Sequence, residues 1–249
     1  HALIAVAEGD GRRAPRPELR VVRDIQESWF EDEDKERCAI ASVLLDNGVN
    51  INHTHTESAK TAIYWAAKRG FSNLVQLLIS RKADVNLGTT TTPLHKAADG
   101  DVVRLLVAAK ADIHKQTKLG ASPLDAAASS GRLEPVQALI KCGTNLQQAR
   151  PSDGVCALFM AATNGHAAVV RVLLDAKAPV DQRDNNTASP LSMACEYGHA
   201  EVAGMLVDAK ADVNDVYTGI TAIEEAQEFN QMGVVEEILK RTTKFRAHE

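Results

Sequence analysis

The sequence predicts an all-α solenoid in which helix-turn-helix units stack and are joined by hairpin-like finger loops. Three markers predict this fold class. The stretch Asp208–Asn214, "DAKADVN", has relatives at Ser80–Asn86, Ala108–His114 and Asp175–Asp181. A second marker, such as "SPLDAAASSG" at Ser122, precedes each helical pair, and an apolar cluster such as "VVRLLV" at Val102 follows it. Because the three markers recur in phase, each copy is expected to be one supersecondary unit.

The first helix of each unit is predicted from its cap. A Ser or Thr oxygen caps a helix N-terminus, and a following Pro lacks an N–H that would have no partner there anyway. Alanine pairs keep this helix thin, and a glycine then ends it in a left-handed conformation, at Gly70, Gly131, Gly165 and Gly198. In the second helix, leucine and valine pairs are expected to fill the core.

The segment Thr92-Pro93-Leu94-His95-Lys96-Ala97 matches the T-P-L-H-x-A mark of one family letter for letter. Together with the period, it makes the chain resemble the ankyrin repeat from about Ala39 to Lys240, and more faintly over Leu3–Gly9. The resemblance implies about six to seven repeats, with one shortened and an insertion in the first. It also implies a concave surface and finger loops that hold another protein.

We expect one solenoid over residues 1–249. Residues 1–53 would be an N-terminal capping repeat with an insertion at 11–37, residues 54–214 the central repeats, and residues 215–249 a C-terminal capping repeat and basic tail. End repeats lack a neighbour on one side and so must differ from the others. Acidic side chains of the last repeat are therefore expected to be solvated, at Glu224, Glu225, Glu228, Glu236 and Glu237.

The insertion changes from basic to acidic along its length. It is either a docking arm anchored by Trp29 and Phe30, since aromatic residues dominate interface energetics, or a surface loop that packs back on the first repeat. The helix after it is expected to start at Cys38.

One repeat is short. The motif centres Lys82 and Lys110 lie 28 residues apart, where the other gaps are 33 or 34. We expect the turn near Thr89–Thr92 and the second helix near Asp99–Val102 to be trimmed, with a local change of curvature over residues 86–112.

The lysine in the motif occupies a position at which the resemblance implies a glycine, as at Gly48 and Gly143. A left-handed backbone costs a lysine about 1 kcal/mol, and a cation at a helix C-terminus recovers about 0.3–1 kcal/mol. This near-balance predicts a positive φ and a structural role for Lys82, Lys110, Lys177 and Lys210.

The candidate contact residues follow the helix cap in successive repeats, and they run from basic through apolar to acidic. A partner helix or extended segment of complementary polarity would suit them. The alternative is a set of ordinary solvated side chains. The set comprises Trp65, Lys68, Arg69, Lys96, Met160, Met193, Tyr197 and Glu225, with Trp29 and Phe30 from the insertion, and finger tips such as His55, Glu57, Lys118, Arg150, Asp153, Asp184 and Tyr217.

Nothing in the sequence predicts an enzyme, a cofactor or a metal site. His53-Thr54-His55 has no third ligand at useful spacing, and the recurrence of His166 and His199 at one repeat position indicates a structural role. The four cysteines form no CxxC pair and are expected to be reduced structural thiols. The leading hypothesis is a protein–protein interaction scaffold. A permanent accessory subunit or inhibitor in a larger complex, and a regulatory or targeting fragment of a longer enzyme, are the alternatives.

The net charge is −5, which gives no electrostatic reason to expect a nucleic-acid partner. No apolar run approaches the roughly 20 residues that span a bilayer, so membrane insertion is not expected. Cysteine usage favours an intracellular, cytoplasmic setting, with an organelle interior as the alternative. Because the chain begins with His1, we expect a fragment, a processed form or the ordered part of a longer protein.

Overall fold

The computed structural model describes residues 33–54, 60–88, 90–214, 216–217 and 219–246, with the side chains of 244–246 excepted. These residues fall into two compact units, which divide after Ile113. The expected opening helix at Leu3–Gly9 lies outside the described residues, as do Trp29, Phe30, His55 and Glu57. The division into capping and central repeats of one solenoid stays a prediction.

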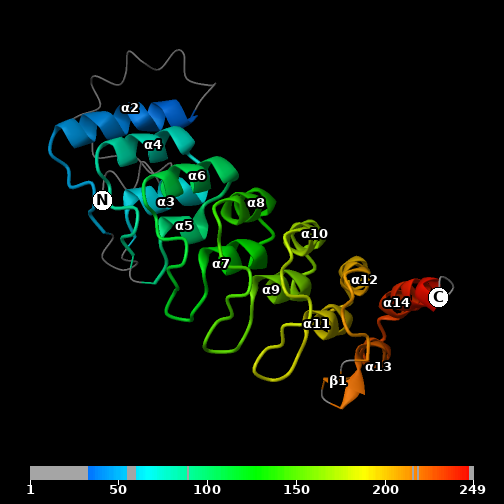
Figure 1. The fold of residues 1–249 in the computed structure, drawn as a ribbon. Coiled ribbons are helices and arrows are strands. Elements are labelled where there is room, and N and C mark those ends of the chain that lie inside the picture. The colour runs from blue at the N-terminus through cyan, green and yellow to red at the C-terminus, as the bar shows by residue number, and fades with distance from the viewer. Residues whose placement is uncertain (1–32, 55–59, 89, 215, 218, 247–249) are drawn as a thin grey trace. The chain divides into compact units, whose positions relative to one another are not determined.

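The first unit contains five helices in the described residues (Figure 1). Short first helices pack on one another, α3 (Ala62–Arg69) on α5 (Pro93–Lys96). Second helices do the same, with α4 (Ser72–Ser80) against both α2 (Glu33–Asp46) and α6 (Gly100–Ala108). Equivalent helices of neighbouring repeats are therefore stacked, as the repeat predicts.

The second unit repeats this arrangement. Its first helices pack in chain order: α7 (Pro123–Ser129), α9 (Ala157–Thr163), α11 (Pro190–Glu196) and α13 (Ala222–Glu228). Its second helices also pack in order: α8 (Leu133–Lys141), α10 (Ala167–Asp175), α12 (Ala200–Asp208) and α14 (Met232–Arg246). A two-residue antiparallel hairpin, β1 (Val216–Tyr217) with β2 (Ile220–Thr221), precedes α13. The all-α solenoid fold is confirmed.

The predicted caps are present. Ser122 Oγ accepts the backbone N–H of Asp125 at 3.2 Å, and the Asp125 carboxylate accepts the N–H of Ser122 at 2.8 Å. In the T-P-L-H segment, His95 Nδ1 accepts the N–H of Thr92 at 3.2 Å. Each pair satisfies donors that a helix N-terminus leaves open, which is why these letters recur.

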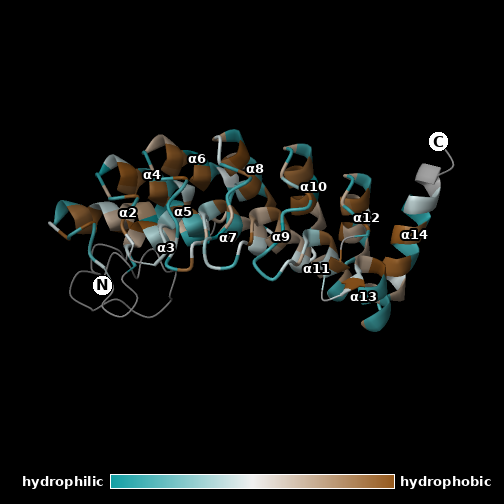
Figure 2. Ribbon diagram, turned by 60° about the horizontal axis from the view of Figure 1, so that its bottom comes forward, coloured by the Kyte–Doolittle hydropathy of each residue, from teal (hydrophilic) through white to brown (hydrophobic). Residues whose placement is uncertain are grey.

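Alanines and aliphatic side chains form the core of each unit. Ala66, Ala67, Leu74 and Leu78 are all 0% exposed. Figure 2 shows the apolar residues concentrated on the helices and the polar residues on the finger loops. Small side chains on the first helix let the next repeat approach closely, so the burial is shared between neighbours.

The last letter of the repeated motif joins one finger to the next. Asn52 Oδ1 accepts the backbone N–H of Asp84 at 2.8 Å, and Asn86 Oδ1 accepts that of Asp112 at 2.8 Å. In the second unit, Asp181 Oδ1 accepts the N–H of Asp212 at 3.1 Å. A polar acceptor at this position is therefore a structural requirement of the stack.

The helix after the insertion was expected to start at Cys38, and this expectation is wrong. Helix α2 begins at Glu33. The reason is the carboxylate of Asp34, which accepts the backbone N–H of Asn73 at 2.7 Å and of Leu74 at 3.0 Å. The N-cap residue of α4, Phe71, provides no side-chain cap. Acidic residues at the end of the insertion thus extend α2 and cap the next helix.

The expected trimming of the second helix in the short repeat is also wrong. Helix α6 has nine residues, as many as α4, whereas α5 has only four. Asp99 caps α6 by accepting the N–H of Val102 at 2.9 Å, and Ala98 donates its N–H to Ala67 O at 3.0 Å. The chain must leave α5 early to make both bonds, so the loss falls on the first helix. The change of curvature stays a prediction.

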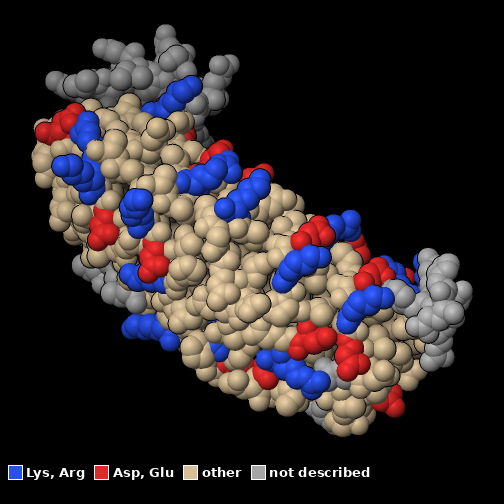
Figure 3. Space-filling view, in the orientation of Figure 1, with Lys and Arg blue, Asp and Glu red and all other residues tan. Residues whose placement is uncertain are grey.

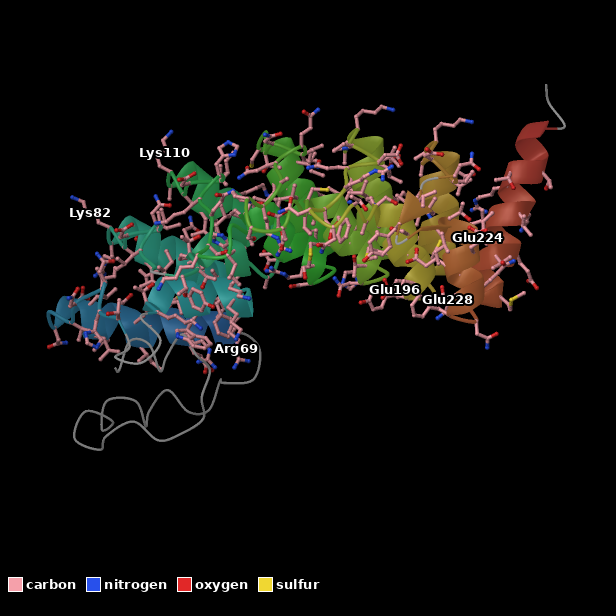
Figure 4. The ribbon with its side chains drawn as sticks, turned by 90° about the horizontal axis from the view of Figure 1, so that it is seen from below. Arg69, Lys82, Lys110, Glu196, Glu224 and Glu228 are labelled. Atoms are coloured by element: carbon pink, nitrogen blue, oxygen red, sulfur yellow. The ribbon has the colours of Figure 1, made fainter. Side chains whose placement is uncertain are left out.

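The prediction for the motif lysines is confirmed. Their φ angles are 65° at Lys82, 69° at Lys110, 66° at Lys177 and 71° at Lys210. All four side chains are exposed, and Figure 4 shows Lys82 and Lys110 extending away from the ribbon. Each lysine ends a helix in the left-handed region, which supports a structural role.

Candidate protein-binding surface

The first unit brings a tryptophan and several cations together, a group we call the basic patch (Lys60, Trp65, Lys68, Arg69 and Lys96). Residues 65, 68 and 69 share one face of α3, since positions three and four apart are neighbours on a helix. Lys68 Nζ lies 4.7 Å from the centroid of the Trp65 ring, and Lys60 Nζ lies 5.4 Å from it. Figure 4 shows Arg69 at the edge of this unit.

Two features of Trp65 stand out in this patch. Its ring is half-buried and meets the Tyr64 ring edge-on, with centroids 5.5 Å apart. Its Nε1–H is enclosed and has no hydrogen-bond acceptor among the described residues. An indole N–H usually finds a hydrogen-bond partner when buried, so its lack of one among the described residues makes Trp65 unusual. Lys60 was missed by the sequence analysis, because it precedes the helix cap and belongs to no repeat marker.

In the second unit, the candidate residues Met160, Met193 and Glu225 occupy one repeat position, the fourth residue after the helix cap. They stand on α9, α11 and α13, which pack consecutively, so they form one column. Met160 is half-buried, Met193 is 8% exposed and Glu225 is 2% exposed. The expectation that Glu225 is solvated is therefore wrong, because α11 covers it.

Two aromatic side chains are exposed beside this column. Tyr197 is 54% exposed and Phe229 is 51% exposed. They are the C-cap residues of α11 and α13, the same position in consecutive repeats. Exposed aromatic side chains in register on packed neighbouring helices form a small apolar surface beside the column.

An acidic cluster (Glu196, Glu225 and Glu228) adjoins the aromatic residues. Burial, the larger cause, and the neighbouring carboxylates of Glu196 and Glu228 together raise the pKa of Glu225 to about 7. The pKa of Tyr217 in β1 is also raised, first by burial and then by acidic neighbours that include Glu196 and Glu225. In Figure 4, Glu196 and Glu228 lie along the same edge of α11 and α13, with Glu224 apart from them.

Several other candidate residues have structural partners. Arg150 pairs with Asp153 at 2.8 Å within one finger, and its Nη2 lies 3.6 Å from the Met160 sulfur. Asp184 Oδ1 accepts the backbone N–H of Asn186 and of Ala188. These side chains shape the fingers that flank the column.

The described histidines of the repeat and the four cysteines have structural surroundings. His166 Nε2 donates to Ser129 O at 3.1 Å and His199 Nε2 donates to Thr163 O at 3.0 Å, so their predicted structural role is confirmed. All four cysteines are free thiols. Burial raises the pKa of Cys195 to about 12 and also raises that of Cys156, which keeps both protonated.

The described residues contain neither a cluster that could bind a metal ion nor a helix that could span a membrane. Among the described residues, no group of three or more His, Cys, Asp and Glu side chains could hold a metal ion. In the same part of the chain, no helix is both long and apolar enough to cross a bilayer.

These features define a helical repeat protein. Each unit has a capped short first helix and a second helix that ends in a left-handed residue, and hydrogen bonds link neighbouring fingers. The chain belongs to the ankyrin-repeat family: the family model "Ankyrin repeats (3 copies)" matches residues 34–117 and 124–217. Ankyrin repeats are in general protein–protein interaction modules and are typically not catalytic.

Relatives and solved structures agree with this assignment. The chain is 34% identical over 140 residues to the Caenorhabditis elegans ankyrin repeat and KH domain-containing protein mask-1, a match covering 53% of this chain and 5% of the relative. It is 27% identical over 171 residues to human neurogenic locus notch homolog protein 1, covering 66% and 7%. The human ASB11 ankyrin repeat domain superposes with a TM-score of 0.72 at 25% identity, covering 84% of this chain and 94% of that one. The chain thus spans only a small part of mask-1 and of the notch protein, 5% and 7% of their lengths.

Proposed function

We propose that the chain is a protein-interaction scaffold whose partner contacts the first helices and fingers of each unit. The observation that carries the proposal is the pair Tyr197 and Phe229, both more than half exposed and in register on packed helices. Large aromatics are the side chains that most often dominate binding energy at interfaces. The half-buried Trp65, with Lys60 and Lys68 over its ring, supports a second contact in the first unit.

The two patches favour contacts of different polarity. The basic patch would attract an acidic segment of a partner, and the acidic cluster would attract a basic one. Such complementarity mainly sets the association rate and the register of the partner. Replacing Tyr197 with alanine is expected to cost about 2 kcal/mol of binding, the usual scale of an aromatic hot spot.

Site-specific photo-cross-linking in the native source tests the proposal. A benzoylphenylalanine placed at position 197 or 229 of the intact chain should cross-link a partner. The matched control is position 171 on α10, where the arginine side chain is 64% exposed but lies on a second helix. Equal or stronger cross-linking from position 171 would contradict the assignment of the first-helix face.

A permanent accessory subunit or inhibitor is the finer alternative within the same class. Size-exclusion chromatography of the endogenous protein separates the two. A partner that co-elutes at every dilution favours the fixed subunit, and one that dissociates on dilution favours the scaffold.

A further inference from the structure

The second unit buries a carboxylate that has one oxygen without a hydrogen-bond partner among the described residues. The Glu225 residue is 2% exposed, and its Oε2 accepts no hydrogen bond from the described residues. Leaving a buried polar atom unpaired is costly, and a buried charge is more costly still. None of the described residues satisfies this oxygen.

Packing does not require a glutamate here. The two preceding repeats have Met160 and Met193 at the same position, and methionine needs no hydrogen-bond partner when buried. The packing of α11 on α13 is thus the same kind of contact as that of α9 on α11, with an acid in place of a thioether. The choice of an acid is left without a structural explanation.

Among the described residues, the charges that shift the pKa of Glu225 are acidic. Glu196 on α11 and Glu228 one turn along α13 are the charges that act on it. Tyr217 from β1 and the protonated Cys195 on α11 are the other titratable groups coupled to it. None of the ion pairs between described residues involves these three glutamates. Figure 3 shows acidic side chains over α11 and α13, beside basic ones over the preceding finger loop.

We propose that Glu225 receives a lysine or arginine side chain of the partner protein, with Glu196 and Glu228 completing an acidic receptor beside Tyr197. This inference names the chemistry of the partner, and it rests on the proposed scaffold function. An ammonium or guanidinium group supplies only donors, which match a cluster that presents only acceptors. The adjacent phenol ring of Tyr197 offers a face for the cation or for its aliphatic stem.

Proton linkage gives the receptor a signature. Glu225 is largely protonated below a pH of about 7 in the free chain, and a cation binds the ionised form. Only the ionised fraction is competent, so the apparent affinity should rise about tenfold between pH 6 and pH 8.

Nuclear magnetic resonance titrations of the intact chain test the proposal. The probes are N-acetyl-lysine methylamide and N-acetyl-arginine methylamide, with the norleucine and glutamate analogues as matched controls. The reporters are the Met193 methyl group and the Phe229 amide. We expect the cationic probes to shift both signals, and to bind about tenfold more tightly at pH 8 than at pH 6.

Two variants isolate the carboxylate. Glu225→Gln should lose the cation binding together with its pH dependence, and Glu225→Met, which copies the neighbouring repeats, should do the same with the fold intact. Glu236→Gln on α14 removes an exposed acid of the same unit and should leave binding unchanged. Equal binding of the norleucine probe, no shift with either cation, or unchanged binding by Glu225→Gln would overturn the inference. If position 197 still cross-links a partner in that case, the result would refute only the cation receptor, and the proposed scaffold function would be retained.

Discussion

The glycine that ends a first helix is expected to stabilise the fold in two ways: it adopts the left-handed turn, and it leaves space for the histidine ring of the next repeat. Gly131 has a φ of 67°, a region that L side chains rarely adopt. A Cβ placed there would lie 2.7 Å from Nδ1 of His166. The same ring holds Ser129 O through Nε2, so Gly131→Ala would displace the ring and weaken that bond.

The cost can be divided into two parts. The left-handed backbone costs an alanine about 1 kcal/mol. The lost side-chain hydrogen bond costs about 1 kcal/mol more. Gly131→Ala should therefore lower the free energy of unfolding by about 2 kcal/mol. Gly143→Ala is the matched control, since its φ is 82° with nothing within 4 Å of the added Cβ, and it should cost only the first part.

Urea denaturation of the intact chain measures the difference. A double-mutant cycle with His166→Ala should show a coupling of about 1 kcal/mol, because removing the ring removes the clash. If Gly131→Ala and Gly143→Ala destabilise equally, or if the cycle shows no coupling, the ring contact has no energetic role and the reasoning fails.

Three further predictions concern the motif lysine, the buried acid and the last helix. Lys177→Gly should change the free energy of unfolding by less than about 0.7 kcal/mol, because the relieved backbone strain offsets the lost charge at the helix end. Lys177→Ala keeps the φ of 66° but loses the charge, so it should lower the free energy of unfolding by about 0.3–1 kcal/mol in the same urea titration. The pKa of Glu225 is raised to about 7 from its usual 4.5, so stability present below pH 4.5 should be lost as the pH rises to 7, by an amount on the order of 3 kcal/mol. Glu225→Met should flatten that profile, and an unchanged slope would contradict the assignment. Arg241 Nε donates to Gly204 O at 2.9 Å and to the Asp208 carboxylate at 3.0 Å, so Arg241→Met should loosen α14 and speed its amide hydrogen exchange, at a cost of about 1–2 kcal/mol.

Local chemistry explains what could be predicted. The caps at Ser122 and Thr92 depend on contacts three residues apart, and the positive φ at the motif lysines depends on one turn of helix. Such features are encoded within a single repeat. Repetition then makes each of them visible several times over.

Contacts between repeats explain what was missed. Helix α2 begins at Glu33 because Asp34 caps a helix about 40 residues away, and no local pattern marks that partner. The shortening of α5 follows from Ala98 bonding to Ala67 in the preceding repeat. The sequence showed that residues were missing, but it placed the loss in the wrong helix.

The sequence by itself determined the family, the repeat and the role of the lysines, because these rest on hydrogen bonds and dihedrals within one unit. Only the tertiary structure decided which acidic residue is unusual. In the row Glu224, Glu225 and Glu228, all three look like solvated end residues. Packing of α11 on α13 buries Glu225 alone, and burial is a property of two helices in contact rather than of either one.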